Sequence, residues 1–125
     1  MIKTERKYDL EERTALFGES IIKLCRKIKL DNIVSPIINQ LVRSATSVGA
    51  NYMEANGASS KRDFINKIFI CKKEAQESKH WLRMLGSSAG STLSNLDLIQ
   101  KECQELIFIF SKIASSSRAK DNLTE

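Results

Sequence analysis

Carboxylates and one histidine at helical spacing are the side chains of this sequence best suited to chemistry. Glu54, Glu74 and Glu77 could take part in a di-iron site, and Glu77 stands three residues before His80, the single histidine. A di-iron helical bundle needs two Glu-x-x-His pairs and further carboxylates, whereas this pair occurs once. No base or nucleophile accompanies His80 in the sequence. We therefore predict no catalytic residues, no metal site, no cofactor and no enzymatic activity.

The three cysteines, Cys25, Cys71 and Cys103, are the second group with reactive side chains. Their number is odd and none stands in a C-x-x-C pair, so neither a disulfide framework nor a zinc site is expected. Cys71 and Cys103 both fall on apolar stripes of helical period. We expect these two thiols to be reduced and to act as small hydrophobic side chains in the core.

Lysine and arginine are the residues that could bind phosphate. They number 20 against 15 acidic residues, which gives a net charge of +5, and the surplus lies in residues 1–30 and 61–83. Such a bias attracts nucleic acids or acidic proteins, although it also describes an ordinary solvated helix face. The candidate nucleic-acid-binding residues are Lys23, Arg26, Lys27, Arg43, Lys61, Arg62, Lys67, Lys72, Lys73, Lys79 and Arg83.

A row of polar residues interrupts a segment that otherwise carries little charge. Its members follow one another at steps of three or four, which places them on one side of a helix. A row of this kind is often only the solvent face, but it could form a polar network or an oligomer interface. The residues of this polar row are Gln40, Arg43, Ser47, Asn51 and Glu54.

Helices must position all of these groups, because apolar residues recur with helical period along the chain. Ile38, Leu41, Ala45 and Val48, for example, are spaced three, four and three apart. Four helices are expected, at about residues 9–29, 36–56, 61–85 and 95–115, before a disordered tail at 116–125. Short links between them predict one all-α domain over residues 1–125, an antiparallel up-down-up-down four-helix bundle.

Local signals mark where these helices begin and end. Ser35 followed by Pro36 predicts a capped start, and residues 60–63 resemble a capping box. Gly57 and Gly86 are expected to end the second and third helices, since glycine accepts the left-handed conformation.

Targeting and membrane signals are absent from the sequence. No run approaches the roughly 18 apolar residues that span a bilayer. The first residues, MIKTERK, are charged and lack the apolar region of a signal peptide. We therefore expect a cytoplasmic protein without membrane contact.

The segment 40–55, QLVRSATSVGANYMEA, resembles the signature of a bacterial four-helix-bundle family, also called the ribosomal-RNA intervening-sequence protein family. The resemblance covers roughly residues 15–113. It departs from the family pattern at Ser44, where many relatives have alanine, and at the turn 55–57. The matching positions are Gln40, Arg43, Ser47, Asn51 and Glu54, then Ser60, Asp63 and Phe64, with 73–77 (KEAQE) and 81–85 (WLRML) in the third helix.

The resemblance implies properties that composition and spacing do not reach. Members are often encoded within insertions in large-subunit ribosomal RNA genes, and related proteins assist the reverse transcriptases of diversity-generating retroelements. Characterised relatives form barrel-shaped homopentamers. We therefore predict a non-enzymatic homo-oligomeric scaffold that associates with RNA or DNA through basic helix faces. The alternative is a module that binds an acidic protein or a nucleic-acid enzyme without touching nucleic acid.

Overall fold

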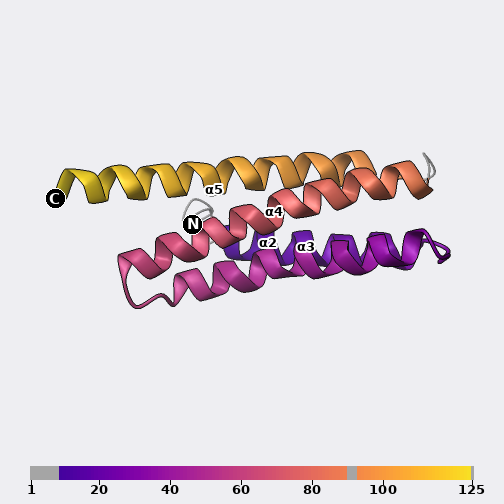
Figure 1. Ribbon diagram of the computed structural model, residues 1–125, viewed down its shortest axis with the longest axis horizontal. Coiled ribbons are helices and arrows are strands. Elements are labelled where there is room, and N and C mark those ends of the chain that lie inside the picture. The colour runs from indigo at the N-terminus through magenta and orange to yellow at the C-terminus, as the bar shows by residue number, and fades with distance from the viewer. Residues whose placement is uncertain (1–8, 90–92, 125) are drawn as a thin grey trace.

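Four α-helices make up most of the part of the chain that the structure describes. The computed structural model describes residues 9–89 and 93–124, with the side chains of residues 10–89 and 93–117. The helices are α2 (Asp9–Arg26), α3 (Val34–Asn56), α4 (Lys61–Ala89) and α5 (Leu96–Thr124). Each runs antiparallel to the one before it (Figure 1). The predicted all-α up-down bundle is confirmed.

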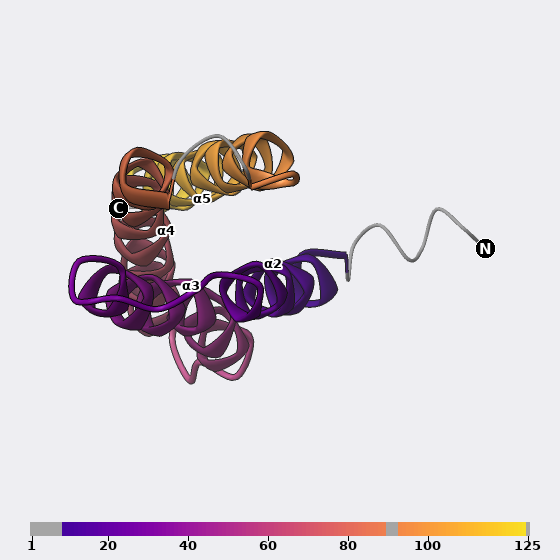
Figure 2. The ribbon, with the colours of Figure 1, turned by 90° about the vertical axis from the view of Figure 1, so that its right-hand side faces the viewer.

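The helices pack in the order in which they follow one another. α2 contacts α3, α3 contacts α4 and α4 contacts α5, while α2 and α5 close the bundle through a sparser contact. Figure 2 looks along the helices and shows α4 between α3 and α5, with α2 beside α3. The contact between α2 and α5 is therefore the weakest side of the bundle.

The core is built from the predicted apolar stripes. Leu41, Ile68, Leu82 and Phe110, one or two from each of the last three helices, are fully buried. Phe17 brings α2 into the same cluster. Removing such a side chain from water stabilises the fold by about 1.5–3 kcal/mol each, so these stripes drive the docking of the helices.

The turn between α2 and α3 differs from the prediction. α2 ends at Arg26, and α3 begins at Val34 rather than after Ser35. Oδ1 of Asp31 accepts the backbone N–H groups of Ile33 and Val34 at 2.9 and 2.8 Å. The cap is therefore Asp31, which satisfies two N–H groups of the first turn that have no partner inside the helix.

Of the two features predicted for the link between α3 and α4, the Ser60 cap is present and the left-handed Gly57 is not. Ser60 Oγ accepts the backbone N–H of Asp63 at 3.0 Å, so the predicted Ser60 cap is confirmed. Gly57 does follow the last residue of α3, but its φ of −96° is not left-handed. Its N–H bonds the Glu54 carbonyl at 3.2 Å, so a tightened last turn ends the helix without a left-handed residue.

Gly86 does not end α4, contrary to the prediction. The helix runs through it to Ala89. A Cβ at this position would lie 3.1 Å from Cδ2 of Leu96. The glycine therefore leaves room for the end of the Leu96 side chain, and the helix continues through it despite its poor helix propensity.

The segment 116–125, predicted as a disordered tail, is helical through Thr124. α5 continues to Thr124, past the serines at 115–117 (Figure 1). Neither glycine nor proline occurs after residue 93. Serine lowers helix propensity only modestly, so no residue here stops the helix. None of the described helices combines the length and the apolar character needed to cross a membrane.

Candidate nucleic-acid and assembly surfaces

The polar row of α3 lies along the contact with α4. Arg43 is the member of this row with the most contacts. Arg43 Nη1 lies 3.3 Å from Oε1 of Glu74, and Nη2 donates to Oε2 of Glu77. Arg43 Nε also donates to Oε1 of Gln40 at 3.1 Å. Arg43, predicted both for nucleic acid and for the polar row, is thus held between the two helices by partners in its own chain.

Glu77 extends these contacts to the tryptophan of α4. Trp81 Nε1 donates to Oε2 of Glu77 at 3.1 Å. This hydrogen bond, with the one from Arg43, lowers the pKa of Glu77 because both stabilise the charged carboxylate. The bond to Glu77 in turn raises the pKa of Arg43. Trp81 packs against the core, and His80 meets its ring edge-on with centroids 4.9 Å apart.

The other members of the polar row are also engaged within the chain. Asn51 Nδ2 donates to the Oγ and the backbone oxygen of Ser47, each at 2.9 Å. Lys67 Nζ lies 2.7 Å from Oε1 of Glu54, and this bond raises the pKa of Lys67. Lys67, a predicted nucleic-acid-binding residue, therefore already has an acidic partner. A contact of the polar row with a second subunit stays a prediction.

A buried hydroxyl pair joins α3 and α4 behind the polar row. Ser44 and Ser78 are both fully buried, and their Oγ atoms lie 2.8 Å apart. Each Oγ also bonds a carbonyl of its own helix, that of Leu41 for Ser44 and that of Glu74 for Ser78. The departure from the family pattern at Ser44 thus coincides with a polar contact in the core.

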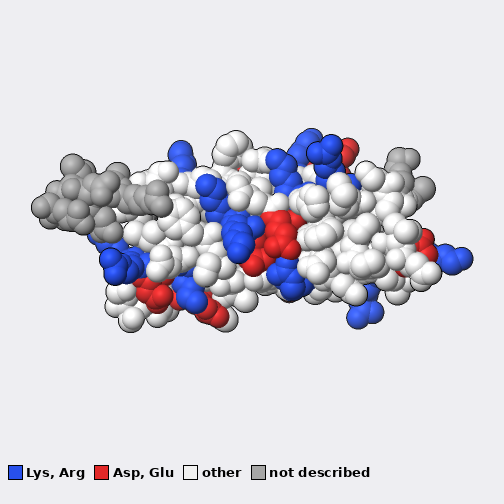
Figure 3. Space-filling view, in the orientation of Figure 1, with Lys and Arg blue, Asp and Glu red and all other residues white. Residues whose placement is uncertain are grey.

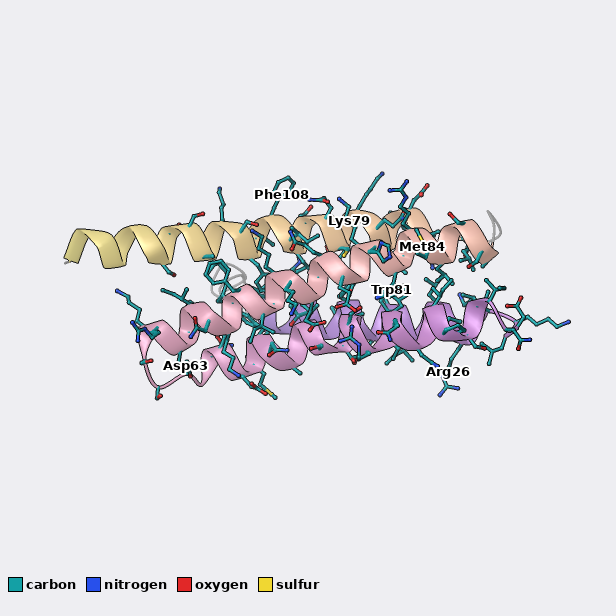
Figure 4. All side chains as sticks on the ribbon, viewed as in Figure 1. Arg26, Asp63, Lys79, Trp81, Met84 and Phe108 are labelled. Carbon is teal, nitrogen blue, oxygen red and sulfur yellow. The ribbon has the colours of Figure 1, made fainter. Side chains whose placement is uncertain are left out.

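The basic residues of α4 are not gathered into one patch on the visible face. Lys and Arg side chains are scattered there around a central group of carboxylates (Figure 3). Lys79 Nζ donates to Oε1 of Gln104 on α5 at 2.6 Å, and Figure 4 shows Lys79 beside that helix. Lys61 begins α4, whereas Arg83 lies near its other end. The remaining predicted residues of this helix are Arg62 and Lys73, which are exposed, and Lys72, which is half-buried.

Four basic residues at the end of α2 do lie together. Lys23, Arg26, Lys27 and Lys29, here called the basic end, are all exposed. Arg26 points away from the bundle in Figure 4. Within the described ranges, none of the four makes an ion pair, unlike Arg43 and Lys67. Arg62, Lys72, Lys73 and Arg83 also make no ion pair with a described residue, but they are spread along α4, so the basic end is where unpaired charge is gathered most closely.

Three residues of the basic end line a pocket of about 790 Å³. Lys23, Lys27 and Lys29 stand on one side of it, and Leu98 and other residues from the beginning of α5 stand on the other. This pocket lies at the end of the bundle that faces the viewer in Figure 2. It combines three ammonium groups with apolar walls and with the carboxylate of Asp31, whose Oδ1 accepts two backbone N–H groups, so its net positive charge suits a ligand that is anionic and partly apolar.

Arg13, for which no role was predicted from the sequence, connects α2 to α5. Its Nε and Nη2 donate to the two carboxylate oxygens of Glu102 at 3.0 and 2.7 Å, and Nη2 lies 2.8 Å from Glu105. These bonds, that of Glu102 first, raise the pKa of Arg13. In the sequence, Glu102 and Glu105 stand three residues apart and could share one basic partner. Their spacing does not indicate which lysine or arginine that partner is.

The described residues with reactive side chains form no metal site, and the three cysteines are buried. Across residues 10–89 and 93–117, no three His, Cys, Asp or Glu side chains group in a way that could hold a metal ion. Burial raises the pKa of Cys25 to about 11 and those of Cys71 and Cys103 to about 12. Such thiols are almost entirely protonated at neutral pH and are poor nucleophiles.

Comparisons with known proteins agree with this architecture. The sequence model of the family described as 23S rRNA-intervening sequence protein matches residues 6–112, a range that includes α2, α3, α4 and the polar row. A crystal structure of a protein of unknown function from the S23 ribosomal protein family of Bacteroides thetaiotaomicron is similar. It has a TM-score of 0.71 and 30% sequence identity, over 83% of this chain and 96% of that one. No curated protein matches the chain.

Proposed function

Since the chain belongs to the 23S rRNA-intervening sequence protein family, we propose that it is a non-enzymatic, oligomeric scaffold that binds RNA through the basic end. One observation carries this proposal. Lys23, Arg26, Lys27 and Lys29 are exposed at one end of the bundle without an ion-pair partner among the described residues, whereas Arg43 and Lys67 are paired.

The physical basis is neutralisation of phosphate charge. Each unpaired lysine or arginine that meets a phosphate releases condensed counterions, which favours binding at low salt. A residue such as Lys67 would first have to give up its contact with Glu54, so it contributes less. Oligomerisation multiplies the effect, because five copies, the number that the resemblance implies, would carry a net charge of about +25.

Fluorescence anisotropy with a labelled RNA hairpin tests the proposal. Lys23→Glu/Lys27→Glu removes part of the basic end, and Lys72→Glu/Lys73→Glu is the matched control with the same change in charge. We expect the first pair to weaken binding at least about tenfold and to lower the slope of log K against log salt by about 1 to 2, with a smaller effect from the control.

Equal losses in the two double variants would contradict the proposed site, since they would mean that only net charge matters. No loss in either variant would exclude RNA from the basic end. Circular dichroism spectra must stay helical for both variants, and this outcome is expected because Lys23, Lys27 and Lys73 are exposed and Lys72 is only half-buried.

An acidic protein partner is the alternative occupant of the basic end. Polyglutamate serves as a probe for such a partner. If the wild-type protein ignores RNA at low salt but binds polyglutamate, and Lys23→Glu/Lys27→Glu abolishes that binding, the protein-interaction module replaces the RNA scaffold.

A further inference from the structure

The pocket at the basic end has an apolar half that phosphate binding alone does not use. Leu24 from α2, Ile28 from the turn after it, and Leu98 and Ile99 from α5 line it beside the lysines. Leu98 is 66% exposed. A surface that served only to attract a phosphate backbone would not need apolar walls of this kind.

Further apolar side chains are exposed in the turn that supplies part of the pocket lining. Leu30 and Ile33, in the turn that follows the basic end, are 63% and 66% exposed. Exposed apolar side chains that gather at one place mark binding surfaces, whereas scattered ones do not need an explanation. Cations and exposed hydrophobic side chains therefore share one end of the bundle.

The size of the pocket narrows the choice of ligand. A volume of about 790 Å³ lies within the range of roughly 300–1,000 Å³ for small-molecule sites, so one nucleotide fits within it. A paired RNA helix presents phosphates and 2′-hydroxyls on its outside, and its bases stay stacked inside. Only an unpaired nucleotide can offer a base to the apolar walls and a phosphate to the lysines at the same time.

We propose that the pocket receives an unpaired nucleotide of the bound RNA, so that the protein selects bulged or looped RNA over continuous duplex. The phosphates contact Lys23 and Lys27, and the base lies against Leu98 and the neighbouring apolar side chains. This inference rests on the proposed RNA scaffold function and specifies which feature of RNA the site recognises.

Two RNA duplexes that differ only in one bulged nucleotide provide the test. We expect the wild-type protein to bind the bulged duplex about tenfold more tightly, since burial of an apolar surface contributes a factor of this size. Ser88→Phe fills the pocket from α4 without changing a charge, and Leu98→Ala removes part of its wall. Both should bring the ratio of the two affinities close to one while duplex binding stays unchanged.

A matched control separates the pocket from general surface hydrophobicity. Phe108 is 65% exposed on the same helix as Leu98 but does not line this pocket. Figure 4 shows its ring projecting from α5. Phe108→Ala should leave the preference for the bulge intact.

The outcomes separate this inference from the function on which it rests. Equal affinity of the wild-type protein for the two duplexes, or a preference that survives both Ser88→Phe and Leu98→Ala, overturns the inference and leaves the RNA scaffold standing. Binding to neither duplex at low salt overturns the scaffold as well.

Discussion

Arg13 of α2 holds the carboxylate of Glu102 on α5 with two parallel hydrogen bonds, of 3.0 Å from Nε and 2.7 Å from Nη2. These residues are far apart in the chain but bridge the two helices with the sparsest contact in the closed bundle. A forked guanidinium–carboxylate pair adds directional bonds where little apolar surface is buried. Arg13 therefore helps to fix the side of the bundle that packing alone determines least.

Arg13→Lys is expected to lower the free energy of unfolding by about 1 kcal/mol, because a lysine keeps the charge but cannot make both bonds to Glu102. Urea denaturation measures the change. Glu105→Gln is the control, since Glu105 is more exposed and makes one bond to Arg13. Glu102→Gln should lower the free energy of unfolding more than Glu105→Gln does. The opposite result would contradict the larger role assigned to Glu102.

The Glu77 carboxylate makes stability depend on acid pH. Its pKa is below the ordinary value of 4.5 in the folded state because Trp81 and Arg43 bond the charged form. The stabilisation is therefore fully present above pH 4.5 and is lost as the pH falls through the lower folded pKa. Wild type should exceed Glu77→Gln in stability by at most about 1 kcal/mol at neutral pH, because the pair is partly exposed.

Urea midpoints of wild type and Glu77→Gln at neutral pH and near pH 3 check this expectation. The difference should shrink at the lower pH. A difference that grows on acidification would mean that the folded protein does not favour the charged carboxylate.

The three thiols should react with a disulfide reagent only when the protein unfolds. Cys71 and Cys103 are fully buried and each donates to a carbonyl of a neighbouring helix, that of Val48 for Cys71 and that of Ala75 for Cys103. Thiolate is the attacking species, and burial keeps all three thiols protonated. Stopped-flow labelling of all three thiols should follow the unfolding rate and speed up in urea. Rapid labelling of Cys71 in the native protein would contradict the packed core.

Gly86→Ala should stabilise the protein by up to about 1 kcal/mol, because alanine is the better helix former. The new Cβ meets only the end of the Leu96 side chain, at 3.1 Å, and that side chain can shift. The gain should be larger in a Leu96→Ala background, where the close contact is absent. Thermal unfolding of the four proteins of this cycle measures both values, and an equal gain in the two backgrounds would contradict the role assigned to Leu96.

Helix identity and core could be read from the sequence because the information is local. Side chains three and four positions apart share a helix face, so Leu41 and Val48 could be placed on one apolar stripe, and Cys71 in the core, before any partner helix was known. The Ser60 cap is local for the same reason, as donor and acceptor lie three residues apart. Where two local signals competed, as at Asp31 and Ser35, the sequence did not reveal which one caps α3.

Tertiary structure decided which charged residues are available. Arg43 and Lys27 look alike in the sequence, yet Arg43 contacts Glu74 and Glu77 of another helix while Lys27 lines a pocket. Whether a lysine or an arginine finds a carboxylate depends on how helices distant in the chain are docked, which helical period does not encode. The pocket itself is lined by residues from the end of α2 and the beginning of α5, which are far apart in the chain. Sequence determined the helices and their buried faces, and only the packing of those helices divided the basic residues into paired and available groups.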